Sequence, residues 1–190
     1  MQGRDDVFDT AVPLALAALY RLIRQQFTPD AWSLVGQQVD FLLDNLPVDP
    51  DSMKLLAYWV NQYSHGGQDF AQTAHHYVDP SLEELGCVVV LQFVACDKQS
   101  IRTRILEVLE RPDLDHIIVA SVFANSALEE DLTKEFEGFL PERLTFLSLC
   151  RSSASDLVDL NSRIFEHFCL ALPSQRLVRL PRHILSRIEK

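Results

Sequence analysis

The most continuous apolar stretch of the chain lies in residues 86–97, where β-branched and aromatic side chains follow one another almost without a polar residue. Two shorter stretches of the same kind follow, at residues 116–124 and 143–150. A strand with one face in water alternates apolar and polar residues, whereas an uninterrupted apolar run is typical of a strand buried on both faces. The pattern therefore predicts three buried strands in the second half of the chain.

The segments after these stretches have the spacing of amphipathic helices. Apolar residues recur three or four positions apart in residues 98–110, 126–140 and 155–172. A repeat of strand and helix gives a parallel sheet covered by crossover helices. Residues 175–180 alternate imperfectly, and Pro181 would suit a sheet edge because it cannot donate a hydrogen bond. We expect an α/β fold with a small three- to four-stranded, mainly parallel sheet.

The first eighty residues show helical spacing and repeated helix punctuation. Thr28-Pro29-Asp30 has the order of an N-cap, a first-position proline and a first-turn acid, and Asp49-Pro50-Asp51 repeats this start signal. Gly66-Gly67 forms a stop, since glycine readily adopts the left-handed conformation that ends helices. The predicted helices cover residues 14–27, 30–46, 51–65 and, more weakly, 69–78. We expect a helical N-terminal part in residues 1–80 and an α/β part in residues 81–190, packed as one compact unit.

Composition narrows the class of protein. The chain has 190 residues, a formal net charge of −10 and 47% hydrophobic residues. No stretch reaches the ~18 apolar residues needed to span a membrane. General nucleic-acid binding depends on lysine and arginine at phosphates, so the acidic balance disfavours it. The four cysteines form no CxxC pair, as is usual in a reducing compartment. We expect a cytoplasmic protein that binds neither nucleic acid nor membrane.

Positive charge is concentrated near the C-terminal end, where a last short helix is predicted over residues 183–188. Five basic residues stand there against one acid, Glu189. The five are Arg176, Arg179, Arg182, Arg187 and Lys190. This segment is either a solvated face that balances an acidic body or a docking surface for an acidic partner. Nucleic-acid binding through it is a third, weaker alternative.

Polar residues follow each of the three predicted strands. In open parallel sheets, ligands bind outside the carboxyl ends of the strands, where loops meet helix N-termini. The side chains placed there include Asp97, Asn125, Arg151 and Ser153. An arginine and hydroxyls before a helix suit a phosphate or carboxylate, although Ser and Asn at such positions are also ordinary helix caps. None of these loops contains glycine, and no GxGxxG or Walker pattern is present, which counts against a nucleotide.

Residue types that support catalysis or metal binding are present but poorly placed. Cys96 and Cys150 each end a predicted strand, and a thiol before a helix start can have a lowered pKa. His116, however, opens its strand at the opposite edge of the sheet, so it cannot serve either thiol as a base. His75 and His76 are adjacent and would diverge by ~100° on a helix. We therefore predict structural cysteines, no metal site and no cofactor.

Two classes of function fit these observations, and no motif is specific enough to name a family. The main hypothesis is a non-catalytic protein-interaction or regulatory module, not an enzyme, that binds a protein partner or associates with itself. Its predicted partner-binding residues are Trp59, Tyr63, Arg176, Arg179 and Arg182. The alternative is a small-molecule or anion-binding, even enzymatic, α/β domain whose site lies at the carboxyl ends of the strands. Its predicted ligand-binding residues are Asp97, Asn125, Arg151 and Ser153.

Overall fold

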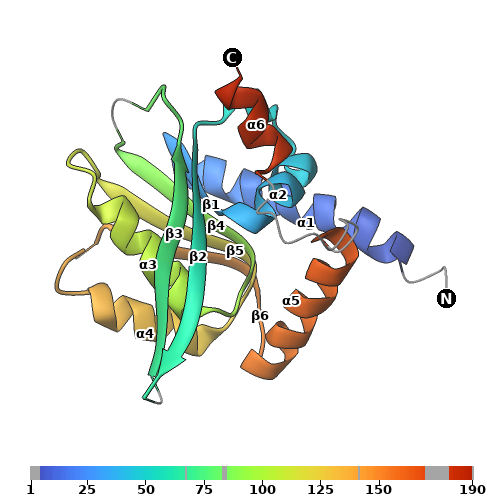
Figure 1. The fold of residues 1–190 in the computed structure, drawn as a ribbon. Coiled ribbons are helices and arrows are strands. Elements are labelled where there is room, and N and C mark those ends of the chain that lie inside the picture. Colours follow the sequence, from blue (N-terminus) through green and yellow to red (C-terminus); the bar gives the residue numbers. More distant parts are fainter. Residues whose placement is uncertain (1–4, 67, 83–84, 141, 170–179, 190) are drawn as a thin grey trace.

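A computed structural model describes residues 5–66, 68–82, 85–140, 142–169 and 180–189 (Figure 1). Its centre is one six-stranded sheet with the order β3-β2-β1-β4-β5-β6. The strands are β1 (Ala31–Val35), β2 (Leu55–His65), β3 (Gln68–Val78), β4 (Cys87–Ala95), β5 (His116–Ala124) and β6 (Leu144–Arg151). All neighbours run parallel except the β2–β3 hairpin, which is antiparallel. The predicted α/β fold with a mainly parallel sheet is confirmed, but the sheet has six strands instead of three or four.

Helices cover both faces of this sheet (Figure 1). They are α1 (Asp5–Gln26), α2 (Val39–Asn45), α3 (Lys98–Leu109), α4 (Ser126–Phe136), α5 (Ala154–Cys169) and α6 (Arg182–Ile188). Apolar side chains of α3 and α4, such as Ile105 and Leu132, pack on one face of the sheet. Those of α1, α2, α5 and α6, such as Leu16 and Leu157, pack on the other face. The result is a three-layer arrangement with two apolar cores.

The three strands predicted from continuous apolar runs are confirmed as β4, β5 and β6. In β4, every residue from Val88 to Ala95 is buried. This follows from its position: β4 lies between β1 and β5, and helices cover it on both faces. The helices predicted after these strands are confirmed as α3, α4 and α5, and the short C-terminal helix as α6.

The predicted helical N-terminal part is largely wrong. α1 matches the helix predicted at 14–27, and α2 confirms the second half of the helix predicted at 30–46. The first half of that segment is the strand β1, and the segments predicted to be helical at 51–65 and 69–78 contain the strands β2 and β3. Asp30 does not start a helix, because its carboxylate accepts a hydrogen bond from the backbone N–H of Cys87, 2.7 Å away, beside β1. Asp49 caps a single 3-10 turn, Pro50–Ser52. Both local signals are therefore overridden by strand pairing.

Strands from both halves of the sequence belong to the same sheet, since β1 pairs with β2 on one side and with β4 on the other. The predicted edge strand at residues 175–180 lies outside the described residues, apart from Leu180, which is not in a strand. Among the helices that the structure describes, none is both long and apolar enough to cross a membrane.

Candidate functional site

The carboxyl ends of β4, β5 and β6 are flush with one another. Ala95 pairs with Ala124, and Ala124 pairs with Arg151 on the next strand. Beyond the paired residues, the backbone N–H of Asn125 donates to the Ala95 carbonyl at 3.3 Å. The loops that carry Asp97, Asn125 and Arg151 therefore open side by side at one edge of the sheet, as the sequence predicted.

Asp97 caps the N-terminus of α3. Its Oδ1 accepts a hydrogen bond from the backbone N–H of Ser100 at 3.2 Å. Its other oxygen, Oδ2, accepts a hydrogen bond from the side-chain amide of Gln62, which lies on β2. The carboxylate thus connects the β2–β3 hairpin to the edge where the other loops open.

Asn125 caps α4 in the same way. Its Oδ1 accepts a hydrogen bond from the backbone N–H of Ala127 at 3.0 Å. Its amide nitrogen has no hydrogen-bond partner among the described residues. Capping and ligand binding are therefore compatible at this residue, because they use different atoms of the side chain.

Arg151 is held at the edge by Glu129 from the first turn of α4. The Arg151 Nε and Nη2 atoms both lie 3.0 Å from Glu129 Oε2. Glu129 Oε1 accepts a further hydrogen bond, at 3.1 Å, from the Ser148 hydroxyl of β6. The Glu129 side chain is only 13% exposed, whereas that of Arg151 is 56% exposed. Glu129 thus orients the guanidinium through Nε and Nη2, and Nη1 has no partner among the described residues.

Ser153 is more fully engaged than the other three predicted residues. Its hydroxyl donates to Asp156 Oδ2 at 2.6 Å and lies 3.1 Å from the Ser155 hydroxyl. Both partners lie in the first turn of α5. The Ser153 hydroxyl therefore closes the start of α5, and the structure gives it the geometry of a cap.

The sequence reasoning missed Arg104, the largest side chain that is fully buried. Its Nη1 donates to the carbonyls of Ser33 and Leu91, both at 3.2 Å. These carbonyls lie where the pairing of β1 with β4 ends, at Ser33 and Val90. The guanidinium thus fills the opening between the two strands. Burial lowers the pKa of Arg104 to about 9, so the side chain remains charged at neutral pH.

A sequence signal for Arg104 exists in hindsight. Ile101, Ile105 and Val108 form the apolar stripe of α3, and position 104 falls on the same stripe at helical spacing. A charged residue at a core position of an amphipathic helix indicates a buried polar contact. Glu129 was also missed, because the run of acids in α4 resembled an exposed helix face.

A reactive cysteine, which the sequence analysis disfavoured, is not supported by the arrangement either. β5 lies between β4 and β6, so Cys96 and Cys150 follow strands that are not neighbours. Burial raises the pKa of the Cys96 thiol, and the neighbouring Asp97 carboxylate raises it further. A thiol with a raised pKa is a poor nucleophile. Among the described residues, no group of three His, Cys, Asp or Glu side chains is placed to hold a metal ion.

Of the predicted partner-binding residues, the structure describes Trp59, Tyr63 and Arg182. The Trp59 side chain is only 6% exposed, so it is not an accessible contact for a partner. Tyr63 is 51% exposed and stacks on Phe70 near the tip of the β2–β3 hairpin. Arg182 pairs with Asp44 of the same chain. Arg176 and Arg179 lie outside the described residues.

Comparison with known proteins identifies relatives in fold only. No family model matches the chain, and no curated protein matches it either. The AQ2163 protein of Aquifex aeolicus is 9% identical, with a TM-score of 0.54, over 76% of this chain and 74% of that one. An adenine phosphoribosyltransferase from Thermoanaerobacter pseudethanolicus is 12% identical, with a TM-score of 0.50, over 77% of this chain and 84% of that one.

The likeness to adenine phosphoribosyltransferase corrects our main hypothesis on function. We predicted a non-catalytic interaction or regulatory module and disfavoured an enzyme. The chain instead shares its α/β fold with an enzyme, this adenine phosphoribosyltransferase. This finding overturns the prediction of a regulatory, non-enzymatic module and favours the alternative, a small-molecule site at the carboxyl ends of the strands. At 12% identity, the likeness shows a shared α/β fold.

Proposed function

We propose that this chain is an enzyme-type α/β domain that binds a small phosphorylated, nucleotide-like molecule at the carboxyl edge of its sheet. The observation that carries the proposal is the strand order. From β1 the chain goes first to β2 and β3 on one side, and then to β4, β5 and β6 on the other. Ligands of open α/β sheets bind outside the carboxyl ends of the strands at such a reversal.

The side chains at this edge supply complementary chemistry. The Asp97 carboxylate can accept hydrogen bonds from ribose hydroxyls or from an exocyclic amine of a base. The free amide donor of Asn125 can bind a ring nitrogen or a carbonyl. Arg151 offers an oriented, charged donor for a phosphate or carboxylate group. The fold shared with an adenine phosphoribosyltransferase supports the choice of a purine and a sugar phosphate as the first ligands to test.

Calorimetric titration with adenine, ribose 5-phosphate and adenosine monophosphate tests the proposal. We expect saturable binding of at least one of these, and Arg151→Ala to weaken the phosphate-containing ligands about tenfold or more, because it removes a charge-assisted hydrogen bond. Binding of adenine alone should be unaffected by this substitution.

Arg143→Ala is the matched control. Arg143 precedes the same strand at its opposite end, where its Nε donates to the Asp115 carbonyl at 2.8 Å. It should leave all three affinities unchanged. If no ligand binds, or if the two arginine variants weaken binding equally, the carboxyl edge is not the binding site.

A further inference from the structure

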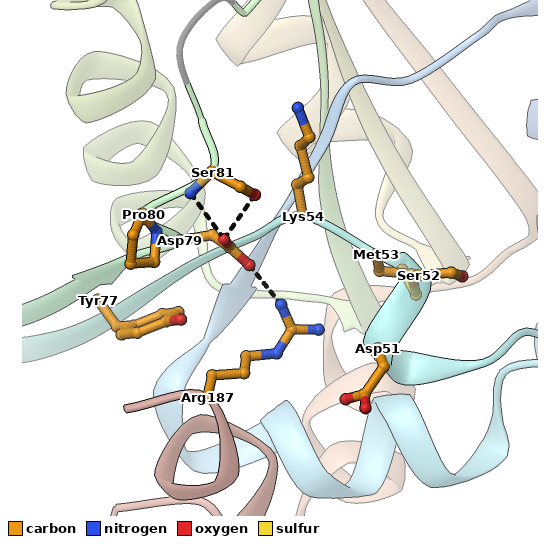
Figure 2. A pocket seen from close by; sticks show the side chains of 9 residues that line it. All are labelled: Asp51, Ser52, Met53, Lys54, Tyr77, Asp79, Pro80, Ser81 and Arg187. Atoms are coloured by element: carbon orange, nitrogen blue, oxygen red, sulfur yellow. Dashed lines mark hydrogen bonds and ion pairs between the residues drawn. The ribbon is translucent and has the colours of Figure 1, made fainter. Parts of the chain in front are cut away.

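The helices α1 and α6 cover the same face of the sheet but are held to it differently (Figure 1). α6 has a buried ion pair: Arg187 pairs with Asp79, whose carboxylate also accepts hydrogen bonds from Ser81 (Figure 2). α1 is anchored through an apolar inner side that lies in the core. The buried residues of this inner side are Val12, Leu16, Leu19 and Ile23.

The outer side of α1 is apolar as well. Between Asp9 and Arg21 the chain contains no charged residue. Four exposed residues follow one another at helical spacing on the side opposite the core, and we call them the outer stripe: Val7, Ala11, Leu14 and Ala18. The side chains of Val7 and Leu14 are 61% and 67% exposed. Because a helix that is apolar all round is normally buried all round, the outer stripe has the character of a surface that another helix covers.

The charges of α1 are divided between its two ends. The first two turns contain Asp5, Asp6 and Asp9, and the last two turns contain Arg21 and Arg24. Both arginines are exposed, and neither has an ion-pair partner among the described residues. A second α1 that runs antiparallel along the outer stripe brings acidic first turns beside basic last turns at both ends. A parallel α1 would instead bring like charges together, which is unfavourable.

We propose that the outer stripe is a homodimer interface, in which α1 packs antiparallel against α1 of a second copy about a two-fold axis near Leu14. Such an interface is self-complementary, because both copies contribute the same surface. Leu14 meets Leu14 of the second copy, and Val7 lies against the aliphatic stem of the second copy's Arg21. Ala11 and Ala18 are small, so the two helices can approach closely. This association does not depend on the proposed ligand.

Sedimentation velocity of the full chain over a range of protein concentrations tests the proposal. We expect the mean mass to rise toward twice that of the monomer. Leu14→Glu places two carboxylates against each other at the axis and should raise the dissociation constant of the dimer about hundredfold or more. The variant should fold, because Leu14 is exposed, and circular dichroism checks this.

Phe139→Glu is the matched control. Phe139 is 78% exposed and follows α4, which packs on the other face of the sheet. This variant should associate as the unaltered protein does. A monomer at every concentration, or association that Leu14→Glu leaves unchanged, would overturn the proposal. A monomer that binds phosphatidylglycerol vesicles through Leu14 would also overturn it, since the outer stripe would then be a membrane-binding surface.

Cysteine cross-linking tests the antiparallel geometry itself. In a chain whose exposed Cys150 is replaced by serine, Leu14→Cys should form a disulfide between two copies under mild oxidation, because the two positions meet at the axis. Val7→Cys should not, since the two positions lie ~21 Å apart along the helices, given the rise per residue of an α-helix. Equal cross-linking at both positions would show a parallel pair and overturn the proposed arrangement.

Discussion

At the scale of single residues, Gly36 has the least room for a side chain among the described glycines, because the indole of Trp59 lies against it. A Cβ atom at position 36 would lie 2.2 Å from Trp59 Cε2 and 2.3 Å from Cδ2. Neither group can move without cost. The backbone at Gly36 directly follows β1, and the Trp59 indole is almost fully buried. We expect Gly36→Ala to lower the free energy of unfolding by about 3 kcal/mol, measured by urea denaturation.

Gly138→Ala is the control for this substitution. A Cβ atom at position 138 would meet nothing within 4 Å. The free energy of unfolding should therefore change by no more than about 0.5 kcal/mol. Equal stabilities of the two variants would show that the Trp59 indole can move aside, and that glycine at position 36 is not required by packing.

At the scale of elements, α6 is held by a buried ion pair at one end and exposed pairs at the other. The side chains of Arg187 and Asp79 are 9% and 11% exposed, whereas that of Arg182, paired with Asp44, is 66% exposed. Removing one partner of a buried pair leaves a charge uncompensated, which costs about 3 kcal/mol or more. Arg187→Met should therefore destabilise the protein by that amount, and Arg182→Met by less than about 1 kcal/mol. Thermal and urea unfolding of the two variants would decide whether burial makes this difference.

The Asp79–Arg187 pair should make the stability of the protein depend on pH in the acidic range. Burial alone would raise the pKa of Asp79, but the hydrogen bonds from Ser81 and the charge of Arg187 outweigh it and lower the pKa below its usual value. A carboxyl group with a lowered pKa in the folded state stabilises the fold at pH values above its unfolded pKa. That stability is lost as the pH falls through the folded value.

Asp79→Asn tests this dependence through urea unfolding between about pH 6 and pH 2. The variant should be less stable than the unaltered protein at pH 6, and the difference should shrink toward pH 2. A difference that stays constant over this range would mean that Asp79 does not titrate with a lowered pKa.

The elements that were predicted correctly are those whose sequence pattern is compatible with only one type of secondary structure. In β4 the apolar run leaves no polar face, so only a strand buried on both sides fits. In β2 the buried residues 55–59 follow a start signal at Asp49 and precede polar residues, a pattern that also fits a helix. β3 was missed because it carries polar residues along most of its length. Its strand structure depends on pairing with β2, and such long-range pairing leaves no signal within the segment itself.

The candidate site was predicted in part for the same reason. Asp97, Asn125 and Arg151 follow strands that the sequence reveals, and the general rule for parallel sheets places them at one edge. Arg104 and Glu129 act through partners on other elements, Leu91 and Ser33 for the first and Arg151 for the second. Such contacts depend on which strands are neighbours. The sequence did not reveal the strand order.

At the scale of the whole molecule, the sheet consists of two halves that meet in a short seam. The β3-β2-β1 half joins the β4-β5-β6 half only through β1 and β4. The paired residues along this seam run from Ala31 with Val88 to Ser33 with Val90, whereas β4 and β5 pair from Cys87 to Ala95. Beyond the seam, the Arg104 guanidinium bonds to a carbonyl of each half. It replaces ladder hydrogen bonds where the two strands separate.

Arg104→Met therefore tests how the two halves are held together. Methionine fills similar space and removes a buried charge, which favours the fold, but it leaves the Ser33 and Leu91 carbonyls without a donor at about 1–3 kcal/mol each. We expect the second effect to win, with a net loss of about 2 kcal/mol in the free energy of unfolding by urea denaturation. Arg102, two residues earlier on α3, is only partly buried and pairs with Glu135 of α4, so Arg102→Met should cost less than about 1 kcal/mol. If Arg104→Met were as stable as the unaltered protein, the free-energy cost of burying the guanidinium would equal the stabilisation from its bridging hydrogen bonds. The seam between β1 and β4 would then not depend on Arg104 for stability.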